Sequence, residues 1–500
     1  MTITIRAGSV LRQCMSASVL LALILAAAAP CRAQANSGFA PAGWDAGVKL
    51  REAVDKNPDP AILEIDLVAK LAEVEVSPGL TVKAWTYDGG LPGPLIRAKV
   101  GNRVIVHFTN ELREPTTVHW HGVRVPIEMD GVPNISQPEV KTGETFTYDF
   151  VVRDPGLFWY HPHVMSAAQV GFGLYGALQV DDPSDGVGIA DELTLVLSDI
   201  GFDKRGDLES AESGGPAGQV FGREGQYVLV NGRQKPAIKA RAGAWQRWRI
   251  VNTAKSRFFL LDMDGQPFTT IGTDGGLQEH PTEAGTVLIT AGERLDVLVR
   301  PTGKPGSSLI VRAMLYNRGY GSVEYRDVED LLTIEFSGEP PMKAQPAPKV
   351  ARQITPPSTE GATRVPVMLT LPPAGPDGRS EFRVNGVPYW QAKPFMARLG
   401  ETQIWTITND TEWDHPFHLH GYYFLPLDEH DQPIHPLGWK DTLNIPMKTT
   451  AKFIVVFDER PGEWMFHCHI LDHAEGGLMG TIAVGDVTPT EHAHGKRSGG

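Results

Sequence analysis

The sequence predicts an all-β protein built from three copies of one β-sandwich. Runs of alternating or β-branched residues between Gly and Pro, such as residues 63–69 and 103–108, are typical of strands, and no long stretch has helical periodicity. A motif of Gly, an alternating strand and Asn nine positions later occurs at 101–110, 243–252 and 400–409. The copies begin 142 and 157 residues apart (243 − 101 and 400 − 243), which is the length of a domain.

The chain is divided accordingly. We expect a secretion signal at residues 1–35 and a lead-in at 36–60. The three sandwiches are expected at 61–185, 189–340 and 361–488, with a linker at 341–360 and a disordered tail at 489–500. The lead-in is rich in Gly, Pro, Asn and Asp, with one short helix predicted at 49–55. Asn231-Gly232 and Asn385-Gly386 predict tight hairpin turns ahead of the second and third copies of the motif.

The first 35 residues have the features of a Sec-type signal peptide. Arginines precede an apolar run at 19–29, and residues 33–35 form an A-x-A cleavage site. The run is short for a membrane span, so we expect cleavage, no stable membrane span, and a periplasmic or secreted protein. Cleavage removes three arginines and no acid, so the formal net charge of −13 becomes −16. A chain this acidic is not expected to bind nucleic acid or an anionic membrane.

One cysteine remains after cleavage, because the other two lie in the signal segment. Cys468 therefore has no disulfide partner in the mature chain, and it is flanked by His467 and His469, with His473 five residues after it. A thiolate with two imidazoles is the donor set of a blue-copper site. If Cys468 ends a strand, side-chain alternation directs His467 and His469 away from it and toward a second metal centre.

Ten of the 16 histidines fall into four short clusters, at 119–121, 161–163, 415–420 and 467–473. An H-x-H pair on a strand places both imidazoles on one face, as metal binding requires. The first and third sandwiches each contribute four histidines in such pairs, so we expect a metal cluster at their interface. The second sandwich holds only His280 and is interpreted as a spacer without metal.

The four clusters read His-Trp-His-Gly, His-Pro-His, His-Pro-Phe-His-Leu-His-Gly and His-Cys-His-x3-His. They resemble the copper motifs of the three-domain multicopper oxidases, the bacterial laccase-like family, over residues 63–484. The resemblance implies three cupredoxin-like Greek-key β-sandwiches and four copper ions. It implies a type 1 copper on His415, Cys468 and His473, a type 2 copper on His119 and His418, and a type 3 pair on His121, His161 and His469 and on His163, His420 and His467.

The resemblance also implies the reaction. A small reducing substrate, which is a phenol, an aromatic amine or a metal ion, would give single electrons to the type 1 copper through the partly exposed edge of His473 or His415. Cys468, with His467 and His469, would carry them to the three-copper cluster, where O2 is reduced to water.

Two positions near the type 1 site depart from the family. Many members have an axial Met where this chain has Leu478, which predicts no axial ligand and a raised potential. Met479 is the alternative axial ligand. Many bacterial relatives have Glu directly after the last type 1 histidine, and here that residue is Ala474.

Proton transfer to O2 requires an acid near the cluster. Asp130 matches the acid that the family places near the type 2 copper, and the alternative is a turn aspartate before Gly131. Glu475 and Asp472 are candidate substitutes for the acid missing at Ala474. Asp472 is equally compatible with a role in shaping its loop.

The electron donor is not identified by any motif. Loops at 318–325 and Trp439 are candidates to line the type 1 pocket by position.

A metallo-oxidase acting on Cu(I) or Mn(II) is the enzymatic alternative, although the 12 methionines form no cluster. Glu412 and Asp414 could serve Mn(II), which prefers carboxylate ligands. An exported copper-binding or scaffold protein is the non-enzymatic alternative. A copper nitrite reductase is disfavoured, because it has no use for eight cluster histidines.

Overall fold

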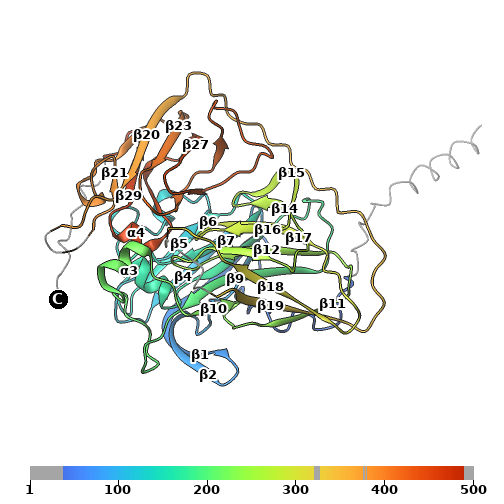
Figure 1. The fold of residues 1–500 in the computed structure, drawn as a ribbon. Helices are drawn as coiled ribbons and strands as arrows, with labels where there is room; N and C mark the ends of the chain where they lie inside the picture. Colours follow the sequence, from blue (N-terminus) through green and yellow to red (C-terminus); the bar gives the residue numbers. More distant parts are fainter. Residues whose placement is uncertain (1–37, 320–326, 376–377, 379, 489–500) are drawn as a thin grey trace, which may run out of the picture. The chain divides into compact units, whose positions relative to one another are not determined.

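The computed structural model describes residues 38–319, 327–375, 378 and 380–488. The predicted signal peptide and the predicted tail lie outside these residues. In the described part of the chain the strands form six sheets, which fall into three consecutive pairs (Figure 1). This arrangement confirms the predicted all-β class with three sandwiches. None of the helices in this part is long and apolar enough to cross a bilayer.

The first sandwich pairs sheet β2-β1-β4-β6 with sheet β3-β8-β7-β5. Its strands are β1 (Ile62–Ser77), β2 (Leu80–Tyr87), β3 (Ile96–Lys99), β4 (Arg103–Asn110), β5 (His119–His121), β6 (Thr145–Val151), β7 (Gly156–His161) and β8 (Gly176–Asp181). The 3-10 helix η1 (Ile127–Met129) follows β5, and α2 (Ser166–Gly171) follows β7.

The second sandwich pairs sheet β10-β9-β12-β17-β14-β15 with sheet β11-β19-β18-β13-β16. Its elements are β9 (Glu192–Ile200), α3 (Gly215–Phe221), β10 (Tyr227–Val230), β11 (Ala237–Ala240), β12 (Gln246–Asn252), β13 (Phe259–Asp262), β14 (Phe268–Thr273), β15 (Gly276–Ala284), β16 (Thr286–Ile289), β17 (Arg294–Val299), β18 (Ser308–Met314) and β19 (Glu329–Phe336).

The third sandwich pairs sheet β21-β20-β23-β27-β25 with sheet β22-β29-β28-β24-β26. Its elements are β20 (Thr363–Thr370), β21 (Arg383–Val384), η2 (Tyr389–Gln391), β22 (Phe395–Ala397), β23 (Thr402–Asn409), β24 (His415–Leu419), β25 (Phe424–Leu427), β26 (Thr442–Ile445), β27 (Thr450–Val456), β28 (Gly462–Cys468), α4 (Leu471–Glu475) and β29 (Met479–Val484). Residues 341–360 join the second and third sandwiches without a helix or strand of their own.

The repeated sequence motif has the same structural role in each sandwich. Its strand, β4, β12 or β23, pairs in parallel with the first strand of its own sandwich. The terminal Asn is buried, and its Nδ2 atom donates to backbone carbonyls that fix the following loop: Glu114 and Val140 for Asn110, Arg257 and Ile289 for Asn252, and Trp413, Ile445 and Pro446 for Asn409. In the first and third sandwiches this fixed loop leads into β5 and β24, which carry the first histidines of their motifs.

The lead-in differs from its prediction. Residues 49–55 form no helix, because their backbone pairs with the first sandwich instead: Ala53 N donates to Leu95 O, and Leu95 N donates to Arg51 O. A seven-residue segment gains little from helix formation without tertiary packing. Val48, just before it, is buried in the core of the second sandwich. The lead-in thus joins two sandwiches.

Candidate metal centres

Three side chains of the third sandwich converge at the end of β28. Cys468 is the last residue of β28, His415 is the first residue of the adjacent β24, and His473 lies in α4. The Cys468 Sγ atom lies 3.4 Å from His415 Nδ1 and 3.8 Å from His473 Nδ1, and the two Nδ1 atoms are 3.2 Å apart. All three residues are buried. A sulfur and two imidazole nitrogens at this spacing form the trigonal donor set of a blue-copper site.

The protonation of this group suits a metal. His473 Nε2 donates to the Val220 carbonyl oxygen at 2.9 Å, which leaves the Nδ1 lone pair directed at Cys468. Burial lowers the pKa of His415 to about 3, so its imidazole is neutral at ordinary pH. Burial also raises the pKa of the Cys468 thiol. The thiolate therefore needs a bound cation to form, and the three residues fit a copper ion that supplies this charge.

Leu478 lies beside Cys468 and His415. It lines a small apolar cavity together with Cys468 and His415, and Met479 is not part of that lining. Met479 begins β29 and pairs with His467 in the β28–β29 register. This placement favours Leu478 over Met479 as the residue beside the mononuclear site.

The mononuclear site is covered, which contradicts the expectation that His473 or His415 has a partly exposed edge. Both side chains are fully buried. The cover is α3 of the second sandwich, whose Val220 carbonyl accepts the His473 Nε2–H. Arg318 donates to the carbonyls of Phe221 and Gly222 and so fixes the end of α3.

Eight histidines of the first and third sandwiches form a second group. Strand register brings them together, because β5 and β7 place His119 opposite His161 and β24 and β28 place His418 opposite His467. Ring centroids lie 5.0 Å apart for His121 and His469 and 5.2 Å apart for His163 and His467. The interface cluster expected from the sequence therefore exists, with these members: His119, His121, His161, His163, His418, His420, His467 and His469.

The nitrogens of this histidine cluster fit metal ions. Outward-facing nitrogens are bonded to acceptors, as in His119 Nδ1 to Asp130 O (2.7 Å), His418 Nδ1 to Asp441 O (2.9 Å) and His467 Nδ1 to Cys468 O (2.9 Å). Buried nitrogens without a partner remain on six of the eight rings: His119 Nε2, His121 Nδ1, His161 Nε2, His163 Nε2, His418 Nε2 and both nitrogens of His469. The two other rings meet through their Nε2 atoms, His420 and His467, at 3.2 Å. Orphaned buried acceptors are rare unless a ligand satisfies them.

Burial also holds the cluster imidazoles in the form that binds metal. It lowers the pKa of His161, His163, His467 and His469 well below the ordinary value, and the neighbouring imidazoles add to the effect. Neutral imidazole is the form that ligates metals. Several overlapping triads offer one nitrogen each within 4.8 Å, among them His163, His420 and His467, and also His119, His121 and His161. The assignment of the imidazoles to individual ions stays a prediction.

Asp130 lies against the cluster. Its Oδ2 atom accepts from His420 Nδ1 at 2.8 Å, its buried Oδ1 atom lies 3.4 Å from His119 Nδ1, and its backbone carbonyl accepts from the same His119 nitrogen. Burial by itself would raise the pKa of Asp130, but the imidazoles of His420 and His119 outweigh it and hold this pKa below the ordinary value. The structure thus places Asp130 at two imidazoles that come from different sandwiches, which is more than a turn aspartate requires.

The two substitute acids have different surroundings. Asp472 is buried and bound by Arg223, through both its backbone N–H and its guanidinium, so its carboxylate holds α4 to the second sandwich. This supports the loop-shaping interpretation. Glu475 accepts from Ala167 N at 2.8 Å in α2, four residues after His163, and burial raises the pKa of Glu475 to about 7. Glu475 is therefore the better candidate for a second acid.

Among the described residues, the positions proposed for the donor side are engaged separately. Asp414 accepts from Tyr316 OH, Asn444 Nδ2 and Met447 N, and Glu412 pairs with Lys448, so the two carboxylates are engaged separately. Trp439 packs at the junction with β15, where its carbonyl accepts from Gly275 N. Of the loop at 318–325, residues 320–325 lie outside the described residues.

Sequence reasoning missed the acid Asp441 and underestimated the second sandwich. Asp441 Oδ1 accepts from His121 Nε2 at 3.2 Å, although the two residues are 320 positions apart. The second sandwich also covers His473 with α3 and places Gly292 against His469, so it contributes contacts to both sites in addition to its predicted place as a spacer. A Cβ added to Gly292 would lie 2.7 Å from His469 Cγ. Contacts made by single residues leave no periodic or clustered signal in a sequence.

Comparisons with known proteins agree with this geometry. Three family models described as multicopper oxidase match residues 69–185, 191–322 and 362–487. The multicopper oxidase MmcO of Mycobacterium tuberculosis is 32% identical over 435 residues, which is 80% of this chain and 83% of that protein. The chain belongs to the multicopper oxidases. A laccase of Bacillus subtilis is 25% identical over 81% of this chain and 90% of its own.

Solved multicopper oxidases share the fold. The enzyme from Campylobacter jejuni, described as a metallo-oxidase, has 27% identity and a TM-score of 0.78 over 90% of this chain and 99% of its own. The enzyme from Pseudomonas thermotolerans has 32% identity and a TM-score of 0.71 over 85% of this chain and 99% of its own. The predicted family, the cupredoxin-like fold and the enzyme class are thereby confirmed. This multicopper oxidase is a copper-dependent oxidoreductase that uses O2.

Proposed function

We propose that the chain is a laccase-like oxidase that oxidises a phenol or aromatic amine and reduces O2 to water with four copper ions. His415, Cys468 and His473 would hold one ion, and the eight histidines of the cluster would hold three. Bound copper supplies one-electron oxidation of the substrate at the first site and four-electron reduction of O2 at the second. The observation that carries the proposal is that Cys468 is covalently joined to His467 and His469, which belong to the other site.

The protein's own residues connect and insulate the two sites. Besides the peptide bonds, His467 Nδ1 donates to the Cys468 carbonyl oxygen at 2.9 Å, which gives a second short route between thiolate and cluster. Burial of seven of the eight cluster histidines, all except the half-buried His163, keeps most bulk water away from the cluster. Asp130, which accepts from His420, and Glu475 are the carboxylates that would pass the protons that O2 reduction consumes.

A metallo-oxidase remains the second candidate, supported by the description of the Campylobacter jejuni enzyme. For Mn(II) the separate engagement of Glu412 and Asp414 argues against a preformed carboxylate site. The proposed location is periplasmic or secreted, after removal of residues 1–35.

The test is the measurement of O2 uptake by the copper-loaded protein with a phenol, an aromatic amine, Cu(I) and Mn(II) in parallel. The proposal expects the highest kcat/KM with the organic donors. A higher kcat/KM with either metal ion would replace the laccase-like substrate by the metallo-oxidase one. A blue protein that consumes no O2 with any donor would contradict both.

A further inference from the structure

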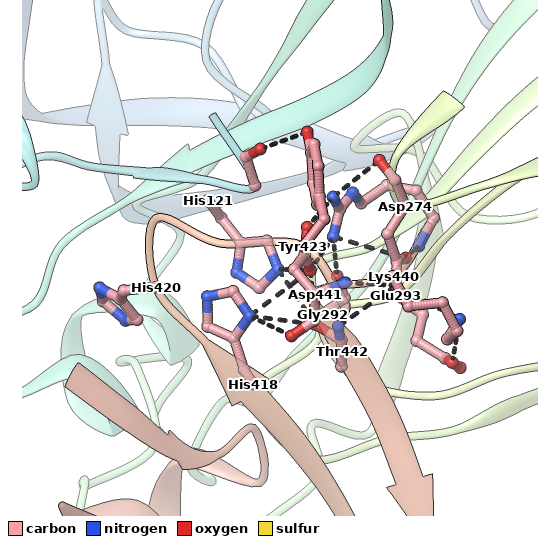
Figure 2. A network of polar contacts seen from close by, with 12 residues as sticks. His121, Asp274, Gly292, Glu293, His418, His420, Tyr423, Lys440, Asp441 and Thr442 are labelled. Atoms are coloured by element: carbon pink, nitrogen blue, oxygen red, sulfur yellow. Dashed lines mark hydrogen bonds and ion pairs between the residues drawn. The ribbon is translucent and has the colours of Figure 1, made fainter. Parts of the chain in front are cut away.

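A buried network of charged side chains lies behind two cluster histidines, His121 and His418 (Figure 2). Its members come from the second and third sandwiches: Asp274, Glu293, Arg294, Lys440 and Asp441. Arg294, Asp274 and Asp441 are at most 1% exposed. Burying ions is costly unless every charge is paired and hydrogen-bonded, so a network of this size calls for a specific role.

Arg294 lies at the centre of the network, at the start of β17, and all five of its side-chain N–H groups have an acceptor. Nη1 donates to Asp441 Oδ1 (2.7 Å) and Gly292 O (3.2 Å). Nη2 donates to Asp441 Oδ2 and to Asp274 O, and Nε donates to Leu157 O in β7. The guanidinium therefore binds groups from all three sandwiches and grips the Asp441 carboxylate with two parallel bonds.

Asp441, which Arg294 holds in place, in turn accepts hydrogen bonds from two imidazoles of the cluster. Its Oδ1 atom accepts from His121 Nε2 at 3.2 Å, and its carbonyl oxygen accepts from His418 Nδ1 at 2.9 Å. The two rings, from different sandwiches, are stacked with centroids 3.7 Å apart and planes inclined by 10°. With their outer nitrogens bonded, His121 Nδ1 and His418 Nε2 remain without partners, as required of metal ligands.

Two glycines show how closely the network fits the cluster. A Cβ at Gly122, the last residue of His-Trp-His-Gly, would lie 2.3 Å from Arg294 Nη2 and 2.8 Å from Asp441 Oδ2. Gly292, whose carbonyl Arg294 binds, packs against the His469 ring so tightly that a Cβ would lie 2.7 Å from its Cγ. Arg294 is thus connected to histidines on both sides of the cluster.

We infer that Arg294, from the sandwich that supplies no copper ligand, is a positioning residue of the histidine cluster. It fixes Asp441 so that His121 and His418 are held at one distance and orientation, and it fixes Gly292 behind His469. A lysine cannot replace it, because an ammonium group is a point charge and cannot make the two parallel bonds to Asp441. The inference rests on the proposed function in one respect, that the cluster binds copper.

The test is the variant Arg294→Lys in the full-length protein. Copper affinity is measured by competition with a chelator, and the two sites are distinguished by the blue thiolate absorption of the Cys468 site and the electron paramagnetic resonance of the cluster. We expect copper affinity at the cluster to fall by about 10–100-fold while the blue absorption is retained. Asp441→Asn, which removes the same ion pair at nearly constant volume, provides a second variant if Arg294→Lys does not fold.

Arg247→Lys is the matched control. Arg247 is also a buried arginine of the second sandwich with a two-bond grip on a carboxylate, Asp296, and it touches no cluster residue. Its variant should lower the melting temperature of the copper-free protein as Arg294→Lys does, but leave cluster affinity unchanged. Wild-type cluster affinity in a folded Arg294→Lys or Asp441→Asn protein, or an equal loss in Arg247→Lys, would overturn the inference. Wild-type protein that binds copper only at Cys468 would instead contradict the proposed function.

Discussion

The mononuclear site and the histidine cluster are built in different ways, although His467, Cys468 and His469 join them. The three donors of the mononuclear site belong to one sandwich, and its cover, α3, comes from another. The cluster takes four imidazoles from each of two sandwiches and is braced by Asp130 and Asp441. The first site thus takes its donors from one domain, and the second takes its donors from two domains and its bracing from all three. Four predictions can break or sharpen this comparison.

The largest effect is expected for Cys468→Ser. The serine oxygen cannot replace the thiolate, so the blue absorption and the turnover with phenols should be lost together. The histidine cluster should still bind copper, because none of its imidazoles is changed. Absorption spectra, O2 uptake and metal analysis of one preparation provide the check. Turnover that survives the change would mean that electrons do not pass through this residue.

Asp130→Asn should impair the cluster and spare the mononuclear site. Loss of the carboxylate removes the anion that accepts from His420 Nδ1 and that would pass protons to the cluster, and kcat should fall by about 100-fold. The rate at which substrate bleaches the blue absorption without O2 should be unchanged. Glu128→Gln, on the exposed surface of η1 two residues away, is the matched control and should behave as wild type. Equal slowing of bleaching and of O2 uptake would show that Asp130 supports the whole fold instead.

The two sites should lose their copper at different concentrations of denaturant. Interfaces between sandwiches loosen before the cores do, so cluster copper should be released at lower urea concentration than the blue absorption is lost. Arg294→Lys should widen this separation, since it weakens the interface and leaves the third sandwich intact. Metal analysis after gel filtration at each urea concentration reports the first event, and absorption reports the second. Loss of both in one step would contradict the comparison.

Leu478→Met should have the smallest effect. The two side chains have similar volume, so the change should cost less than about 1.5 kcal/mol of stability. A thioether beside Cys468 stabilises oxidised copper, and the potential of the blue site should fall. Potentiometric titration of the blue absorption checks this, with Met479→Leu as the control that leaves the potential unchanged.

Features that rest on local sequence patterns could be predicted, and contacts between sandwiches could not. The sandwiches were predictable because strands have a period of two, and Gly-strand-Asn recurs with a buried Asn that fixes the same loop in each copy. The histidines were predictable because they lie in short local motifs. Asp441, Arg294 and the carbonyl of Val220 were not, because each acts alone across more than 140 positions, where no periodicity or spacing marks it.

The close packing at Gly122 has a consequence for protein engineering. The space above its backbone is filled by the Arg294 guanidinium and the Asp441 carboxylate, which belong to two other sandwiches. Transplanting His-Trp-His-Gly onto an unrelated β-scaffold would therefore reproduce the ligands without the counter-ions that hold them. If Arg294 positions the cluster as proposed, a minimal artificial site of this type needs parts of all three sandwiches, including the one without a predicted metal ligand.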